Sequence, residues 1–146
     1  MLRVVAVLAA LAVGATAVYA QNAGAIAQRQ ATMKEFAEAT KVVGPMMKGE
    51  VPFDLAKVQA SLKVIETTAI KGKSVFPDDS KVGDTYALPA AFENKADLFA
   101  RFDKLAAEAK AAQASMKDEA SFKASMGKLI SGNCISCHKQ YQKPSQ

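Results

Sequence analysis

The chain has 146 residues, of which 50% are hydrophobic, 23% charged and 7% aromatic, with a formal net charge of +5. This length suits one globular domain. The basic residues form no cluster and no aromatic residues alternate with them, so nucleic-acid binding is not supported.

The first twenty residues have the composition of a secretory signal peptide. A short basic start ending at Arg3 precedes an almost wholly apolar run over residues 4–18, and small residues lead up to Ala20. The apolar run is too short to span a membrane and is followed by polar residues. We predict cleavage after Ala20 and one domain over residues 21–146, which contains no further apolar segment long enough to span a bilayer. The alternative is an uncleaved anchor.

Four stretches of the remaining chain repeat apolar residues with the period of an α-helix, and no stretch is convincing as a strand. Gly44-Pro45 should kink or end the first helix. Four amphipathic helices of comparable length, joined in part by short turns, favour an all-α fold, an antiparallel up-down four-helix bundle. We expect helices at about 22–47, 54–72, 90–116 and 119–142.

One long irregular stretch, 74–89, interrupts this pattern with prolines and a glycine. A loop of this length in a small domain is often functional. Two interpretations are open: the loop folds over the end of the bundle, or it covers part of a bound group.

Both cysteines and the only histidine fall in the segment Cys134-Ile135-Ser136-Cys137-His138, on the inward face of the last helix. The order C-x-x-C-H is the attachment pattern of a c-type haem. The two thiols form thioether bonds with the porphyrin, and the imidazole of His138 binds the iron as its proximal ligand. At helical spacing the three side chains share one face. We therefore expect one covalently attached haem c, enclosed by the bundle.

Three other interpretations of the motif are weaker. A disulfide between the cysteines would close only a tiny loop. A thioredoxin-like redox pair belongs in a βαβ setting, and no strand pattern precedes this motif. A zinc site needs four ligands, and no obvious fourth remains. Because haem attachment needs thiols that are reduced in an oxidising compartment, the motif and the export signal together indicate an exported, periplasmic c-type cytochrome.

The opposite side of the iron needs a different ligand, because there is no second histidine. Methionine is the next soft ligand. In an up-down bundle only Met33 lies on an inward stripe near the haem end, and its alternative role is ordinary core packing. The other methionines of the domain lie too far along their helices: Met46, Met47, Met116 and Met126.

These features together resemble the class II c-type cytochromes, the cytochrome c′ family, over about residues 26–143. The matching features are Arg29-Gln30 in a helical N-terminus, a helical middle, and the haem motif close to the C-terminus. In this family the Arg-Gln pair lies beside the haem, and the residue four after the arginine faces the distal side of the iron. High-spin members usually carry a non-ligating apolar residue there, whereas the low-spin cytochrome c-556 type carries Arg-Gln-x-x-Met-Lys. This chain reads Arg29-Gln30-Ala31-Thr32-Met33-Lys34.

The resemblance implies that Met33 is the distal iron ligand of a low-spin haem, and that Arg29 and Gln30 lie on its propionate side. A solvated surface position is the alternative for Arg29. With both axial positions filled, the protein would be an electron carrier and not an enzyme, serving transient redox partner proteins. The alternative is a high-spin, five-coordinate cytochrome c′ that binds NO or CO. A peroxidase would need a distal acid–base histidine, which is absent. The resemblance also allows a homodimer through the first two helices.

Two positions depart from the family pattern. High-spin members commonly have Arg or Lys four residues after the haem histidine, where this chain has Gln142. The family's frequent tryptophan near the start of the third helix is replaced by Phe92. The first departure weakens the gas-binding interpretation, and the second suggests that the haem packs differently in detail.

Overall fold

The computed structural model describes residues 2–144, and their side chains from residue 23 onward. Within this part there is no β-strand, only one isolated antiparallel bridge between Ala87 and Gln142. The prediction of an all-α fold is confirmed. The α-helices, in chain order, are α1 (Leu2–Lys48), α2 (Leu55–Gly72), α3 (Ala90–Glu93), α4 (Lys95–Ser115), α5 (Glu119–Leu129) and α6 (Ser136–Tyr141).

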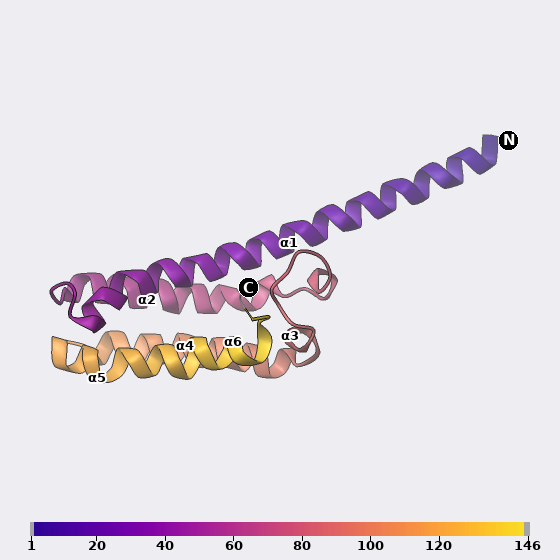
Figure 1. Ribbon diagram of the computed structural model, residues 1–146. Helices are drawn as coiled ribbons and strands as arrows, with labels where there is room; N and C mark the ends of the chain where they lie inside the picture. Colours follow the sequence, from indigo (N-terminus) through magenta and orange to yellow (C-terminus); the bar gives the residue numbers. More distant parts are fainter. Residues whose placement is uncertain (1, 145–146) are drawn as a thin grey trace.

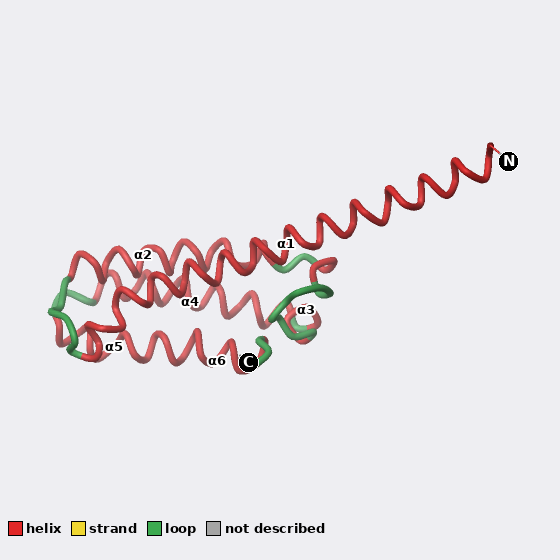
Figure 2. Tube along the Cα trace, turned by 45° about the horizontal axis from the view of Figure 1, so that its top comes forward, coloured by secondary structure: helices red, strands yellow, loops and turns green. Residues whose placement is uncertain are grey.

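Four helical rods lie side by side and alternate in direction (Figure 1). They are α1, α2, α4, and the continuous rod formed by α5 and α6. The second view shows the same arrangement, with the loops gathered at the two ends (Figure 2). The predicted antiparallel four-helix bundle is therefore confirmed.

The helix α1 begins upstream of the predicted start at residue 22, and its N-terminal part projects beyond the other rods (Figure 1). The side chains of the predicted export signal, 1–20, lie outside the described part, and cleavage after Ala20 stays a prediction. Among the described residues, no helix combines the length and the apolar character needed to cross a bilayer.

Two helix starts follow directly from capping residues in the sequence. The side chain of Asp54 accepts a hydrogen bond from the backbone N–H of Lys57 at 3.0 Å, which starts α2 at the predicted place. At the start of α5, Asp118 and Ser121 form a reciprocal capping box, with Asp118 accepting from the Ser121 N–H at 2.8 Å. Such bonds satisfy N–H groups that a helix start leaves without partners.

The predicted end of the first helix, at about residue 47, is confirmed to within one residue. Pro45 lies in the last turn of α1, where its missing N–H removes one hydrogen bond, and the helix ends at Lys48. The third predicted helix is interrupted, since it is divided at Asn94 into α3 and α4. Asn94 has φ −112° and ψ 44°, outside the helical region, and asparagine is unfavourable inside helices because it competes for backbone hydrogen bonds.

The apolar stripes predicted for the helices meet in one core. Val58, Leu62 and Ile65 of α2 belong to the same core cluster as Val43 of α1 and Phe122 of α5, and all five side chains are buried. Burial of side chains of this size is the main force that holds the rods together.

We expect Leu62→Ala to lower the free energy of unfolding by about 3 kcal/mol, because Leu62 is fully buried and its truncation leaves a cavity. Val51→Ala, in the turn between α1 and α2, is the control, since Val51 is 43% exposed, and it should change stability by less than about 0.5 kcal/mol. Urea unfolding followed by circular dichroism measures both. Equal effects would contradict the packing described here.

Candidate haem site

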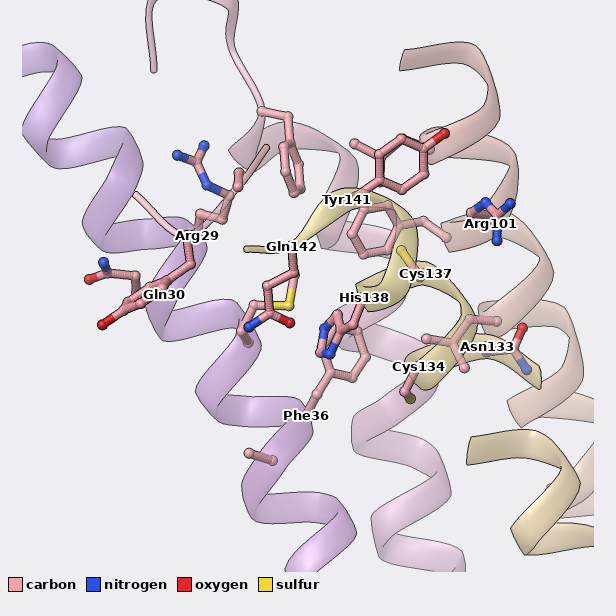
Figure 3. Close-up of a pocket in the computed structure, with 18 of the residues that line it drawn as sticks. Arg29, Gln30, Phe36, Arg101, Asn133, Cys134, Cys137, His138, Tyr141 and Gln142 are labelled. Atoms are coloured by element: carbon pink, nitrogen blue, oxygen red, sulfur yellow. The ribbon is translucent and has the colours of Figure 1, made fainter. Parts of the chain in front are cut away.

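A cavity of about 710 Å³ lies at the end of the bundle where α6 ends. Its walls come from α1, α4, the C-terminal rod and the loop segment 84–87 (Figure 3). The volume lies within the usual range of cofactor sites. Most of the lining is apolar. Its large apolar side chains are Phe36, Phe76, Leu98, Phe102, Leu105 and Ile130.

The three residues of the C-x-x-C-H motif all line this cavity. Cys134 and Cys137 are half-buried and are not joined to each other in a disulfide. The imidazole of His138 comes from the same rod, and the close-up shows it facing α1 (Figure 3). Two free thiols and one imidazole at an apolar cavity are the donor set that covalent attachment of a haem requires.

Burial shifts the titration of these groups. It raises the pKa of both thiols, an effect that the nearby Arg101 guanidinium partly opposes at Cys137. It lowers the pKa of His138. The imidazole is therefore neutral at physiological pH, which is the form that can bind a metal ion.

We predicted that the haem motif lies on one uninterrupted α-helix. The structure differs, because a π-helical turn, Ile130–Ile135, joins α5 to α6. Cys134 belongs to this wider turn, whereas Cys137 and His138 lie in α6. The wider turn leaves carbonyl groups that side chains satisfy: Ser136 donates to the carbonyl of Gly132 at 2.6 Å. π turns inside helices are frequent at functional sites.

Asn133 ties the π turn to α4. Its amide nitrogen donates to Glu108 Oε2 at 2.7 Å and to the carbonyl of Leu129 at 2.9 Å. Its amide oxygen accepts from Lys104 Nζ at 3.1 Å. The sequence does not reveal these partners, because nothing in the spacing of one helix reports the side chains of another.

A second polar network ties α6 to α4. The hydroxyl of Tyr141 donates to Asp97 Oδ2 at 2.5 Å, and Arg101 Nε donates to the same oxygen at 2.6 Å. Arg101 Nη2 also donates to Gln140 Oε1 at 2.7 Å. The acid and base four residues apart in α4 were a visible signal for an intrahelical pair, but not for its contact with α6.

Met33 of α1 lines the cavity together with His138. Of the described methionines, no other contributes to the walls. The structure thus brings together the two side chains that sequence reasoning predicted as axial ligands. Met33 is partly buried, as are its neighbours Phe36 and Thr40, and all three side chains line the cavity.

Arg29 is not a solvated surface residue, because it is only 4% exposed. Its guanidinium is occupied by protein groups: Nη1 donates to the carbonyl of Val75 and the hydroxyl of Ser80, both at 2.9 Å. Nη2 donates to the carbonyl of Ser80 at 3.0 Å and to Thr85 Oγ1 at 2.9 Å. The aromatic rings of Phe76 and Phe92 lie 5.1 and 5.4 Å from its central carbon. Burial lowers its pKa, and no carboxylate of the described residues forms an ion pair with it.

Gln30 and the loop complete the rim of the cavity. Gln30 Nε2 donates to the carbonyl of Asp84 at 3.2 Å, and both residues line the cavity. Of the two interpretations of the loop, the structure supports the one in which it covers part of the site, since residues 84–87 form one wall.

Gly72, at the end of α2, makes room for one aromatic wall. A Cβ atom at this position would clash with the ring of Phe102, so only glycine lets that ring approach the helix so closely. Phe102 belongs to both the cavity wall and the apolar core.

The comparisons with known proteins agree with this site. Residues 24–142 match the Cytochrome C′ family. The chain is 51% identical over 118 residues to a cytochrome c′ of Rhodopseudomonas palustris, covering 80% of each chain. It is 34% identical over 128 residues to a cytochrome c-556 of Agrobacterium fabrum, covering 88% of this chain and 86% of that one.

Solved structures show the same relationship. Cytochrome c′ from R. palustris superposes with a TM-score of 0.80 at 49% identity, covering 84% of this chain and 98% of that chain. The oxidized cytochrome c556 of R. palustris gives a TM-score of 0.74 at 27% identity, with coverage of 84% and 98%. A helical bundle whose last rod presents two thiols and an imidazole to an apolar cavity is the architecture of a class II c-type cytochrome. The chain belongs to the cytochrome c′ family, which confirms both the predicted relationship and the prediction of haem c as the cofactor.

The network at Tyr141 predicts a dependence of stability on pH. Hydrogen bonds from Arg101 and then Tyr141 lower the pKa of Asp97. A carboxyl group whose pKa is lower in the folded state stabilises the fold above its unfolded pKa of about 4, and this contribution is lost as the pH falls through the folded value. We therefore expect Asp97→Asn to destabilise the protein at about pH 7 and to have a smaller effect at about pH 3.

Urea unfolding at both pH values measures this difference. Asp79→Asn is the control, because Asp79 forms no side-chain hydrogen bond or ion pair among the described residues. A difference between wild type and Asp97→Asn that stays constant or grows on acidification would contradict the assignment.

Proposed function

We propose that this protein is an exported electron carrier whose single haem c is low-spin, with His138 as the proximal and Met33 as the distal iron ligand. One observation carries the proposal: His138 of α6 and Met33 of α1 line the same cavity, and no other described methionine does so. An imidazole and a thioether are a recurrent ligand pair in electron-transferring cytochromes.

Each residue of the motif has a separate role in this proposal. Cys134 and Cys137 hold the porphyrin by thioether bonds, and His138 supplies the neutral imidazole. The bound haem supplies a reversible one-electron change at its iron. The apolar walls keep water away, and together with thioether ligation they raise the reduction potential. Since both axial positions are filled, substrate chemistry has no open site, and the protein is not an enzyme.

Arg29 and Gln30 lie on the propionate side in this proposal. The buried charge of Arg29 has no carboxylate partner among the described residues, which leaves it available to balance an acidic group in the cavity. Its Nη1 and Nη2 atoms already donate to the loop, so its effect on a propionate comes from its charge and from Nε. Gln30, at the exposed rim, is placed to donate a hydrogen bond there.

The alternative function is a high-spin, five-coordinate cytochrome that binds NO or CO. The 51% identity to a cytochrome c′ favours it, whereas Met33-Lys34 following Arg29-Gln30 favours the cytochrome c-556 type. Both kinds of relative match this chain, so the choice depends on Met33 itself.

The proposed setting follows from the export signal and the covalent cofactor. The protein would work in the periplasm, in transient contact with redox partner proteins. A homodimer would form through α1 and α2, where exposed apolar side chains include Val42, Val64 and Ile70.

The decisive experiment is the absorption spectrum of the holoprotein with and without Met33→Ala. The wild type should be low-spin with a methionine–iron band and should take up CO slowly. The variant should become high-spin and bind CO readily, because it lacks the sulfur ligand. Met47→Ala, on the same helix but outside the cavity, should leave the spectrum unchanged. A high-spin wild type would establish the gas-binding alternative.

The attachment itself is tested by denaturing electrophoresis followed by haem staining. We expect the wild type to keep its haem after unfolding, because thioether bonds survive denaturation. The double variant Cys134→Ala/Cys137→Ala should lose the stain completely, and each single variant should retain only one bond and accumulate less holoprotein. Ser136→Ala, between the cysteines, is the control. Stain retained by the double variant would refute covalent attachment.

A further inference from the structure

The loop that forms one wall of the cavity is attached at both of its sides. On one side it is bonded to α1, the helix of Met33. On the other it is bonded to the end of the rod that carries His138. We define the strap as residues 75–88, which contain all the loop groups in these contacts.

The attachment to α1 is made by Arg29. Its four bonds reach Val75, Ser80 and Thr85, so one guanidinium fixes three points of the strap. Ser80 is fully buried and Thr85 is 7% exposed, which shields these bonds from water. A hydrogen bond to a charged group is stronger than one between neutral groups, more so where water is excluded. Arg29 is one helical turn from Met33, on the same side of α1.

The attachment to the C-terminal rod uses the backbone. The N–H of Leu88 donates to the carbonyl of Tyr141 at 2.9 Å, and the N–H of Lys143 donates to the carbonyl of Tyr86 at 2.8 Å. In addition, Lys143 Nζ donates to the carbonyl of Thr85 at 2.8 Å. Thr85 is therefore held from both sides, by Arg29 through its hydroxyl and by Lys143 through its carbonyl.

The backbone of the strap is shaped for this path. Gly83 has φ +124°, a conformation that side-chain-bearing residues rarely adopt, and a Cβ atom there would come within 2.9 Å of Ile26 Cδ1. The chain thus passes close to α1 and turns at Gly83 directly before the segment that lines the cavity.

We propose that the strap sets the distance across the cavity between Met33 and His138. Arg29 is the positioning residue, because its hydrogen bonds attach the strap to α1. This inference rests on the proposed function, because it concerns the retention of Met33 as an iron ligand. A loosened strap lets α1 move relative to the C-terminal rod, so that the sulfur leaves the iron more often. The protein then spends more time in a five-coordinate state that binds CO.

The apparent affinity for CO measures this population. Carbon monoxide binds only when the sulfur is off the iron, so its apparent affinity scales with the fraction of molecules in that state. Thr85→Val removes the hydroxyl that accepts from Arg29, and from the Ala87 N–H, with almost no change of shape. We expect an increase of about tenfold in the apparent CO affinity of the ferrous holoprotein, the factor that loss of one bond to a charged group produces.

Thr32→Val is the matched control. Thr32 is also buried, but its hydroxyl donates only within α1, to the carbonyl of Gln28 at 2.9 Å. It should change CO affinity by less than about twofold. Ser80→Ala is a second test variant, because Ser80 bonds to Arg29 but does not line the cavity, and it should act in the same direction as Thr85→Val. Amide hydrogen exchange at 84–88 should accelerate in Thr85→Val and Ser80→Ala but not in Thr32→Val.

Unchanged CO affinity in both strap variants, or an equal rise in Thr32→Val, would overturn the role of the strap. A rise in Thr85→Val alone would also overturn it, since a local effect of valine on the cavity wall would explain that result. Failure of the proposed function looks different: the wild type itself would then lack the methionine–iron band and bind CO readily.

Discussion

The constraint on which the rest of this structure depends is a cavity of about 710 Å³ inside a small bundle. Where apolar side chains fill the space between the rods, as around Leu62 and Phe122, close packing keeps the helices in place. Hydrogen bonds between helices, such as the one from Gln113 to Glu66, add to it. At the cavity the helices cannot pack directly on one another. Around the cavity, hydrogen bonds between side chains hold the neighbouring segments together. They join the C-terminal rod to α4, and α1 to the loop.

Much of the fold and of the site could be predicted because the relevant information is local. The helical period gives the rods, Asp54 and Asp118 give two helix starts, and the C-x-x-C-H spacing gives the attachment site. The placement of Met33 beside His138 needed only helix rise and the alternating direction of a bundle. These inferences use one element at a time, or a single rule for how elements alternate.

The features that were missed depend on contacts between residues distant in the chain. Arg29 was assigned to a propionate or to the surface, but its bonds reach residues 46 to 56 positions later. Asn133 in the π turn binds Glu108 of another helix, and Asn94 interrupts the third predicted helix with a non-helical backbone conformation. The apolar period reports neither feature. Arg29 and Asn133 are polar side chains that the structure buries, and the sequence does not name the partners that bury them.

The polar contacts also divide the cavity into two sides with different support. The proximal side is bonded directly to α4 at two levels, through Asn133 in the π turn and through Tyr141 at the end of α6. The distal side, α1, is bonded at this end to α2, where Thr68 donates to Glu35 at 3.0 Å, and through Arg29 to a loop. Of these two supports the loop deforms more easily than the helix. In the proposed site, Met33 on α1 is therefore expected to dissociate from the iron more readily than His138. Under the proposed role of the strap, we expect a change in a few loop residues, with the motif and the bundle intact, to shift the protein toward a five-coordinate state.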